Sequence, residues 1–433
     1  MPTYRAVLAL VVLAAVAARA QSSPSSRARC APDNGGINLP AGLCATIFAD
    51  SLPGPRHLFV AANGDVFVSL AGARRRDTTI TGGVMVLRDR DGDGVADEQH
   101  KFGAFRASEV ALFDGHVYTE NTTAILRYPL AQGALEPSGG PDTVVKDLPG
   151  GGHAFKTFTI TRDGSLFVNV GSRTNSCQSR DRNPEVPGED PCTELETRAG
   201  IWRFDARELG QTQSTGEHFA RGIRNSVAIT IGPRNTLYVM QHGRDQLGGV
   251  PPGGNWPKLF NDTANSELPA EEMFQVSRGD DFGWPYCYYD PQQRKKLLAP
   301  EYGGDGKRVE RCASKKGNVA AFPAHWAPNS LLFYTGSLLP AKYRDGAFIA
   351  FHGSWNRAPL PQAGFKVVFQ PMRNGRASGP FEVFADGFAP NLVVGRSTAA
   401  TGNRRPSGLA QGPDGALYIT DDALGRVWKV TTK

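Results

Sequence analysis

One histidine stands where the chain is shaped to meet a ligand. In the stretch GGGHAFKTFTITRDGSLFVNVGSR (151–174), His153 directly follows a run of glycines and precedes a strand-like alternation. Glycine lets the backbone bend and approach a ligand closely, because it has no Cβ. Imidazole changes its charge near neutral pH and therefore suits a general base. A hydrogen-bonded structural histidine is the alternative interpretation of this position.

Two arginines occupy comparable places further along the chain. Arg224 lies in RGIRNSVAI (221–229) and Arg405 lies in GNRRPSGLA (402–410), each just before an expected strand. The rigid guanidinium fork pairs with carboxylates and stacks on flat rings, so such groups favour a planar anionic ligand. Taken singly, each arginine could instead form a salt bridge between structural units. The recurring placement favours one site shared with His153.

A repeated pattern predicts the elements that would bring these residues together. A turn followed by an alternating strand occurs six times, at 62–70, 113–121, 162–170, 233–241, 344–352 and 413–421. A second strand-like motif follows each copy, at 84–89, 124–128, 200–205, 273–279, 366–371 and 426–430. Turn plus alternation is typical of β-hairpins, and repeated four-stranded units are typical of propellers. We therefore expect an all-β, six-bladed β-propeller.

The propeller is expected to occupy residues 43–433. LCATIFA (43–49) would supply the strand that closes the ring against the last unit. Residues 280–335, rich in Gly, Pro and aromatic residues, are expected to form an insertion, with a hidden seventh blade as the less favoured alternative. Residues 21–42 are predicted to be an N-terminal arm. Loops at one end of a propeller surround a pocket, so polar residues near the ends of several inner strands should converge there.

The start of the chain is typical of a secretory signal peptide, which we assign to residues 1–20. Arg5 precedes an unbroken apolar run, and small residues flank a cleavage site before Gln21. The run is too short to span a bilayer. We expect a periplasmic or secreted protein that does not span the membrane.

The six cysteines agree with export. They fall as local pairs, Cys30 with Cys44, Cys177 with Cys192 and Cys287 with Cys312. We favour three bridges between neighbours, and one or two free buried thiols are the alternative. The sequence has no C-x-x-C motif, which argues against a zinc ribbon or an attached haem. The formal net charge of +6 is scattered, so no nucleic-acid partner is expected.

Five segments together resemble the soluble pyrroloquinoline quinone (PQQ)-dependent sugar dehydrogenases, the glucose/sorbosone dehydrogenase family, and the sorbosone dehydrogenase branch most. These segments are LPGGGHAFKTFTITRDGSLFVNVGSR, RGIRNSVAITIGPRNTLYVMQHGRD, GDDFGWPYC, AFIAFHGSWNR and RRPSGLAQGPDGALYITDD. The similarity runs from about residue 43 to the C-terminus. It implies an enzyme that oxidises an aldose or a sorbosone-like sugar by hydride transfer to PQQ, with one calcium ion chelated by the cofactor.

The resemblance also implies roles for individual residues. His153 would take the proton from the sugar hydroxyl, and Arg224 would stabilise the negative charge that develops on the quinone. Asn225 matches a cofactor-binding asparagine. The backbone carbonyls of Gly243 and Arg244 match those that bind the cofactor's calcium, a hard ion that prefers oxygen ligands. Arg405 matches an arginine that pairs with the quinone's carboxylates.

The chain also departs from the glucose-oxidising members. Ser407 stands where they have a second arginine, and Ser354 stands where they have a lysine that contacts the cofactor. His352, Trp355 and Arg357 lie nearby in sequence and are candidate substitutes that bind the cofactor. Glucose is therefore not carried over as substrate. Because no haem-attachment motif is present, electrons are expected to leave to a separate acceptor, either a soluble carrier or the quinone pool.

An acidic stretch, DRDGDGVADE (89–98), is a second candidate metal site. Four carboxylates fall at positions 1, 3, 5 and 9 of a calcium-binding loop, namely Asp89, Asp91, Asp93 and Asp97. Position 12 is His100 rather than the bidentate glutamate, and no helices flank the stretch. The alternatives are a structural calcium site and an acidic hairpin turn.

Two other functions fit the same expected fold. A calcium-dependent propeller lactonase needs carboxylates or amides aimed into the channel, and the predominance of His and Arg disfavours it. A non-catalytic carbohydrate-binding propeller needs no base, and it predicts that His153→Ala leaves ligand affinity intact. The fold alone does not decide among the three, because propellers host many functions.

Overall fold

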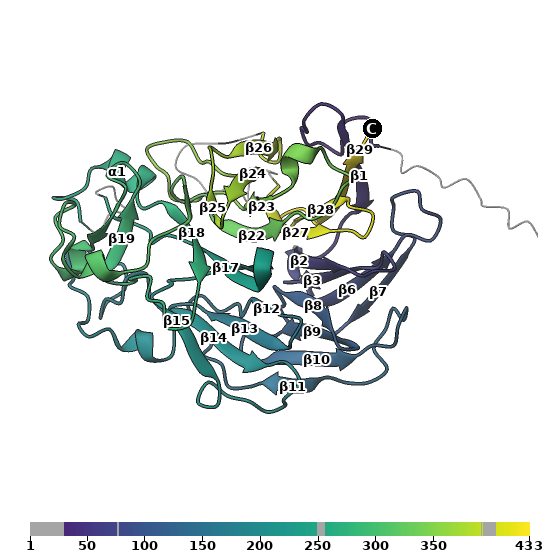
Figure 1. Cartoon of the computed structure of the whole chain (residues 1–433), viewed down its shortest axis with the longest axis horizontal. Coiled ribbons are helices and arrows are strands. Elements are labelled where there is room, and N and C mark those ends of the chain that lie inside the picture. The colour runs from purple at the N-terminus through teal and green to yellow at the C-terminus, as the bar shows by residue number, and fades with distance from the viewer. Residues whose placement is uncertain (1–29, 76–77, 249–255, 391, 393–403) are drawn as a thin grey trace, which may run out of the picture.

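The six repeated units of the sequence form six antiparallel sheets. The computed structural model describes residues 30–75, 78–248, 256–390, 392 and 404–433. Within these ranges the six sheets have four or five strands each and are arranged as a ring (Figure 1). The predicted all-β, six-bladed β-propeller is thus confirmed, and the predicted signal peptide lies outside the described residues.

The first three blades each contain four strands in sequence order from the centre outwards. Blade one is β2 (Pro55–Val60), β3 (Val66–Leu70), β6 (Gly83–Arg88) and β7 (Glu98–Phe102). Blade two is β8 (Val110–Phe113), β9 (His116–Glu120), β10 (Ile125–Pro129) and β11 (Asp142–Val145). Blade three is β12 (Phe158–Ile160), β13 (Ser165–Val170), β14 (Gly200–Asp205) and β15 (Glu217–Arg221).

The last three blades follow the same plan with small additions. Blade four is β16 (Ala228–Gly232), β17 (Thr236–Gln241), β18 (Glu271–Val276) and β21 (Ala320–Phe322). Blade five is β22 (Pro328–Phe333), β23 (Gly346–Phe351), β24 (Lys366–Arg373) and β26 (Glu382–Ala385), with β25 (Arg376–Ala377) paired to β24. Blade six is β27 (Pro406–Gln411), β28 (Leu417–Asp421), β29 (Arg426–Thr432) and β1 (Leu43–Ala49).

The second strand of a blade is covered on both faces by the neighbouring blades. Strands β3, β13 and β23 are buried at every position, which explains their nearly continuous apolar sequences. The outer strand β7, by contrast, alternates between half-buried and exposed residues. The core therefore lies in layers between blades. One such layer joins Tyr118 of blade two to Phe158 and Trp202 of blade three.

The N-terminal strand closes the ring, as predicted. Strand β1 pairs antiparallel with β29, so the first and last parts of the chain share one blade (Figure 1). The Cys30–Cys44 disulfide fastens the described part of the predicted arm to β1. Ile37 of the arm is buried against the core of blades five and six. The other two bridges also join neighbours, Cys177 with Cys192 and Cys287 with Cys312, which confirms the predicted pairing.

The predicted C-terminal boundary of the insertion at 280–335 lies too far along the chain. Strands β21 and β22 fall inside that range and belong to blades four and five. The added structure before them includes the hairpin β19 (Cys287–Asp290) and β20 (Lys295–Leu298), and no further four-stranded sheet occurs in the described residues. The outer strand β21 spans three residues, which is too short to show an alternating pattern.

The remaining regular elements are short. The hairpin β4 (Ala73–Arg75) and β5 (Thr78–Ile80) leaves blade one, and the helix α1 (Asp262–Glu267) follows β17. Five 3₁₀ helices complete the set: η1 (Thr193–Glu196), η2 (Pro233–Asn235), η3 (Pro300–Tyr302), η4 (Glu310–Ser314) and η5 (Ala341–Tyr343). Among the residues described, none of these helices has the length and apolar character that crossing a bilayer requires.

The first strands of the six blades surround the axis. Strands β2, β8, β12, β16, β22 and β27 line a central cavity of about 350 Å³. Because neighbouring strands are antiparallel, the loops that enter first strands and the loops that leave second strands lie at the same end. We call this end the cup, formed by the loops before β2, β12, β16 and β27 and after β13, β17, β23 and β28.

Candidate functional site

His153 lies on the loop that enters β12; its Nδ1 is hydrogen-bonded, and its Nε2 has no hydrogen-bond partner among the described residues. Its Nδ1 lies 2.8 Å from the carbonyl oxygen of Ser172, which also accepts the backbone N–H of His153 at 3.0 Å. A carbonyl oxygen can only accept, so Nδ1 carries the proton and Nε2 keeps its lone pair. Burial, reinforced by the positive charge of Arg224, lowers the pKa of His153 to about 3. The imidazole is therefore neutral at neutral pH.

The glycines before His153 are required by the path of the backbone. Gly152 has a φ of +58°, and a Cβ there would lie 2.6 Å from the Cα of Arg173. Gly171, at the end of β13, is also closely approached, because a Cβ would lie 2.6 Å from the Cβ of His153 and 2.8 Å from Oδ1 of Asn225. These contacts let the His153 loop lie directly against the loop that follows β13.

Arg224 lies on the loop that enters β16 and is only 3% exposed. Its guanidinium donates to the carbonyl oxygen of Asn175 at 3.3 Å, to that of Gly243 at 3.1 Å and to Oδ2 of Asp245 at 3.1 Å. Burial alone would raise the pKa of the Asp245 carboxyl, but the charges of Arg224 and Arg182 outweigh it and hold that pKa below its ordinary value. Arg224 and Asp245 therefore form an ion pair at the edge of the cup.

Asn225 and the two predicted calcium-binding carbonyls lie next to Arg224. Asn225 is buried, and its Oδ1 lies 3.4 Å from Nδ2 of Asn169. The N–H of Gly243 donates to Glu271 at 2.7 Å, which fixes the peptide that follows β17. The side chain of Arg244 turns away and forms a buried ion pair with Glu301 at 2.5 Å. The backbone of Arg244 is thus the part of this residue that could bind a ligand in the cup.

A second cluster is built from blades one, five and six. Arg405 donates to the carbonyl oxygens of His352 at 3.0 Å and Gly353 at 2.7 Å. Nε2 of His352 lies 2.7 Å from Oδ1 of Asp422, and the other carboxylate oxygen pairs with Arg56. Burial, with the charge of Arg405 added, lowers the pKa of His352 to about 4. The imidazole of His352 beside Arg405 is therefore neutral at neutral pH.

The two clusters approach one another at the cup. The guanidinium of Arg56 lies 5.1 Å from the ring centroid of Phe155, two residues after His153. His242 is bonded through Nε2 to the carbonyl oxygen of Pro328 at 2.9 Å, and burial outweighs this bond and lowers its pKa to about 4, with the charges of Arg224 and His352 acting in the same direction. The structure thus brings His153, Arg224 and Arg405 together, although they are far apart in the sequence.

Two of the proposed cofactor-binding residues, Arg357 and Trp355, and the neighbouring Ser354 differ from this group in their contacts or exposure. Arg357 donates to the carbonyl oxygens of Ser266 at 2.7 Å and Ala324 at 3.0 Å, and it lines a surface cleft beside β21. Trp355, on the loop after β23, is 50% exposed. Ser354 is buried and bonded to Gln362 at 2.6 Å. In this loop it is Asn356 that reaches the Arg224 cluster, through Oδ1 of Asp245 at 2.7 Å.

Four members of the site were not among the predicted residues: Arg56, Phe155, Asp245 and Asp422. Arg56 stands at the start of β2, as Arg405 stands just before β27, so the register of the repeats could have identified it. The two aspartates follow second strands, where no recurring motif marks them. Their roles emerge only from contacts with arginines of other blades.

The acidic loop at 89–98 joins β6 to β7, so it lies at the end of the propeller opposite the cup. Carboxylate oxygens of Asp89, Asp91 and Asp97 lie within 4.8 Å of one another. Asp93 instead accepts the N–H of Val95 at 2.8 Å. Asp89 also accepts two N–H groups of its own loop, as an acidic turn would. Calcium binding by this loop stays a prediction.

Comparison with known proteins identifies the family. The TrAA12-like family matches residues 37–433 of the chain. The protein belongs to the TrAA12-like family. This TrAA12-like protein is 27% identical over 309 residues to the pyrroloquinoline quinone-dependent pyranose dehydrogenase of Coprinopsis cinerea, covering 64% of this chain and 39% of that protein. A Borreliella burgdorferi protein is 27% identical over 273 residues, covering 62% and 58%. The chain spans less than two thirds of the length of both relatives.

Solved structures share the propeller fold of this TrAA12-like protein. The holo form of the pyranose dehydrogenase PQQ domain from Coprinopsis cinerea superposes with a TM-score of 0.72 at 18% identity, covering 91% of this chain and 97% of that one. A calcium structure of a Trichoderma reesei family AA12 enzyme gives 0.72 at 18% identity, covering 92% and 97%. The PQQ-bound aldose sugar dehydrogenase of Streptomyces coelicolor gives 0.52 at 16% identity, covering 92% and 100%.

Proposed function

We propose that this protein is a PQQ- and calcium-dependent oxidoreductase that oxidises an aldose or a sorbosone-like sugar. The observation that carries the proposal is the neutral imidazole of His153 among the guanidiniums of the cup, fixed through Nδ1 and with no partner for Nε2 among the described residues. Homology to a PQQ-dependent pyranose dehydrogenase supports it. When bound, PQQ would supply the hydride acceptor that a protein side chain cannot provide.

The groups of the cup fit a flat tricarboxylate and a hard cation. Arg56, Arg224 and Arg405 supply positive charge, and guanidiniums suit carboxylates and planar rings. The carbonyl oxygens of Gly243 and Arg244 are ligands that calcium prefers. Gly243 already accepts from Arg224 at 3.1 Å, but a carbonyl oxygen has two lone pairs and can serve both partners. Ser407 adds a buried hydroxyl that has no partner among the described residues.

The chain's own residues divide the work of the reaction. Nε2 of His153 would accept the proton of the sugar hydroxyl as the hydride leaves the same carbon. The carboxylates of an anionic ligand beside His153 would favour the imidazolium and raise its pKa, which makes it a stronger base in the complex. Arg224 would stabilise negative charge that develops next to it. Arg405, in the second cluster, would also hold the ligand.

We also propose the compartment of the protein and its electron-accepting partner. The three disulfides are typical of a protein from an oxidising compartment, and with the apolar start of the chain they support a periplasmic or secreted location. The electrons would pass to a separate acceptor, a soluble carrier or the quinone pool. Within the glucose/sorbosone group we retain the sorbosone dehydrogenase branch as the proposed specificity.

The lactonase alternative is weakened by the contacts of the acidic groups. Asp245 is paired with Arg224, and Asp422 is paired with Arg56 and His352. These carboxylates are compensated by cations and do not form a cluster aimed at an ion. A calcium-dependent hydrolase would need free oxygen ligands at the axis.

One experiment separates the three functions. The purified protein is stripped with a chelator, reconstituted with PQQ and calcium, and offered aldoses and sorbosone with an electron-accepting dye. Dye reduction that requires PQQ supports the proposal. Lactone hydrolysis without PQQ binding would establish the hydrolase instead. Sugar binding with neither activity would leave a carbohydrate-binding propeller.

A further inference from the structure

A single residue, Ser172, connects the proposed base to the proposed electrostatic catalyst. The N–H of Ser172 donates to the carbonyl oxygen of Arg224 at 2.7 Å. The carbonyl oxygen of Ser172 accepts from Nδ1 of His153 at 2.8 Å and from the backbone N–H of His153 at 3.0 Å. A shift of Ser172 would therefore disturb the tautomer of His153 and the backbone of Arg224 together.

Asn175, three residues later, holds the guanidinium and its counter-ion. It is 1% exposed, and its carbonyl oxygen accepts from Nε of Arg224 at 3.3 Å and from Nε1 of Trp284 at 3.0 Å. Its side-chain amide forms two hydrogen bonds with the backbone of Asp245. Nδ2 donates to the carbonyl oxygen at 2.9 Å, and Oδ1 accepts the N–H at 2.8 Å. Asn175 thus sets the relative positions of Arg224 and Asp245.

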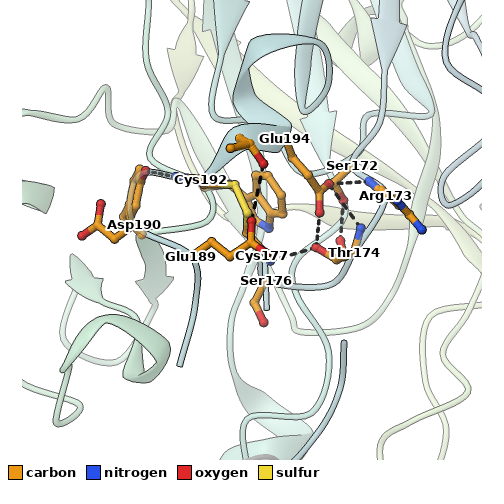
Figure 2. Close-up of a disulfide and its surroundings, with 12 residues drawn as sticks. Ser172, Arg173, Thr174, Ser176, Cys177, Glu189, Asp190, Cys192 and Glu194 are labelled. Carbon is orange, nitrogen blue, oxygen red and sulfur yellow. Dashed lines mark hydrogen bonds between the residues drawn. A yellow bond between two sulfur atoms is a disulfide. The ribbon is translucent and has the colours of Figure 1, made fainter. Parts of the chain in front are cut away.

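The Ser172–Asn175 segment is not part of a strand, so its shape must be held from outside. Figure 2 shows how Glu194 reaches it: the carboxylate accepts the N–H groups of Arg173 at 2.6 Å and Thr174 at 3.3 Å, as well as the hydroxyl of Thr174. The same hydroxyl accepts the N–H of Cys177 at 2.8 Å. The segment is therefore fastened at two successive peptides and one side chain.

The Cys177–Cys192 disulfide closes the loop that carries both partners (Figure 2). Both cysteines are buried and pack against Ala199 and Trp284, the second of which also binds Asn175. Glu194 lies two residues after Cys192, so the bridge fixes where its carboxylate stands. Without the bridge, the segment between the two cysteines, which lie 15 positions apart, would lose a covalent constraint on its path.

We propose that the loop from Ser172 to Glu194, braced by the Cys177–Cys192 disulfide and by Glu194, is a positioning element that holds His153 and Arg224 in register. The inference rests on the proposed function for its effect on turnover, but its structural content concerns the protein without cofactor. Apolar layers between the blades hold the propeller together, so we expect the propeller to stay folded when this bridge is removed. A displacement of about 1 Å at a reacting group costs on the order of a hundredfold in rate.

The test compares two double variants of the full chain. Cys177→Ser/Cys192→Ser removes the bracing bridge, and Cys30→Ser/Cys44→Ser removes a bridge of the same kind on the outer strand of blade six, away from the cup. We expect the first variant to unfold cooperatively on heating, to lose about a hundredfold in kcat with a smaller change in KM, and to bind PQQ more weakly. The control variant should keep kcat within about twofold of the parent.

A second readout is independent of activity. Nitrogen NMR of the protein without cofactor reports which ring nitrogen of His153 is protonated. We expect Nδ1–H in the parent and in the control, and a mixture of tautomers in Cys177→Ser/Cys192→Ser. If the parent shows no PQQ-dependent turnover, the proposed function fails, whereas the tautomer measurement still decides the bracing. An unchanged tautomer together with unchanged kcat would overturn the positioning role.

Glu194→Gln tests the same proposal with a smaller change, for the case in which the double cysteine variant does not fold. The amide keeps the shape of the carboxylate but loses one acceptor, so either Thr174 or the backbone N–H groups lose a partner. Glu196→Gln is the matched control, since Glu196 is exposed and lies two residues away. We expect Glu194→Gln alone to lower kcat and shift the tautomer of His153. Equal behaviour of the two variants would contradict the proposal.

Discussion

Asp422 lies 2.7 Å from Nε2 of His352 and pairs through its other oxygen with Arg56. One carboxylate thus joins a first strand of blade one to the loop after the second strand of blade five. The same His352 offers its backbone oxygen to Arg405. This part of the cup therefore depends on the Asp422 carboxylate, together with the buried Asp421, which accepts the backbone N–H of Arg405 at 2.7 Å.

Asp422→Asn is expected to destabilise the protein by about 3 kcal/mol at pH 7, because it leaves Arg56 buried without its counter-ion. Urea unfolding measures the difference. Asp114→Asn is the control, since Asp114 pairs with Arg207 on the surface and its loss should cost less than about 1 kcal/mol. Two variants of equal stability would show that Asp422 does not organise this part of the cup.

The contribution of Asp422 to the free energy of unfolding should decrease as the pH falls. Burial opposes ionisation of Asp422, but His352 and Arg56 outweigh it and hold its pKa below the ordinary value. A group with a lowered folded pKa stabilises the protein above its unfolded pKa and loses that stabilisation as the pH falls. The difference between parent and Asp422→Asn should therefore shrink as the pH falls below about 4. A difference that grows with acid would contradict this account.

Three cup histidines predict a second acid effect. The pKa values of His153, His242 and His352 are lowered to about 3, 4 and 4, chiefly by burial. Between these values and the ordinary pKa of about 6.5, the unfolded chain binds more protons than the native one, so stability falls as the pH drops through this window. The thermal midpoint measured from pH 7 to pH 4 should decline, and His242→Gln should flatten that decline. A midpoint that rises toward pH 4 would refute the burial of neutral imidazoles.

Arg224→Lys tests whether the shape of the guanidinium matters as well as its charge. Lysine keeps the positive charge, but its single nitrogen cannot occupy the three positions from which Nε, Nη1 and Nη2 of Arg224 bond Asn175, Gly243 and Asp245. We expect kcat to fall by about 10² to 10³ and PQQ to be retained less well. Arg221→Lys, three residues earlier and on the surface, should change neither. Kinetics of Arg224→Lys that match the parent would remove Arg224 from the mechanism.

The fold followed from the sequence because each blade repeats a local signal. The turn before β13 and the alternation within it recur in every unit, and burial between blades explains why those strands are apolar. The end of the insertion was misplaced because β21 has three residues and because β22 is apolar at most positions without a clear alternation. Local pattern thus identifies the second and third strands of a blade better than its first and outer strands.

The candidate site was found in part for the same reason. His153, Arg224 and Arg405 precede first strands in a recurring register, which a sequence can display. Asp245 and Asp422 become meaningful only through ion pairs with arginines of other parts of the ring, which the sequence order does not show. Arg357 stands next to Asn356 in sequence, yet only the asparagine reaches the cup, because the direction of each side chain depends on the path of the loop.

The most direct test of the central claim follows the absorbance of protein-bound PQQ in a single turnover. PQQ and calcium are added to the parent, to His153→Ala and to the surface control His116→Ala, and sugar is then mixed in without an electron acceptor. We predict that all three bind PQQ with similar affinity, that the parent and His116→Ala reduce it rapidly, and that His153→Ala reduces it at least about a hundredfold more slowly. Rapid reduction in His153→Ala would show that the proton leaves by another group and would contradict the account.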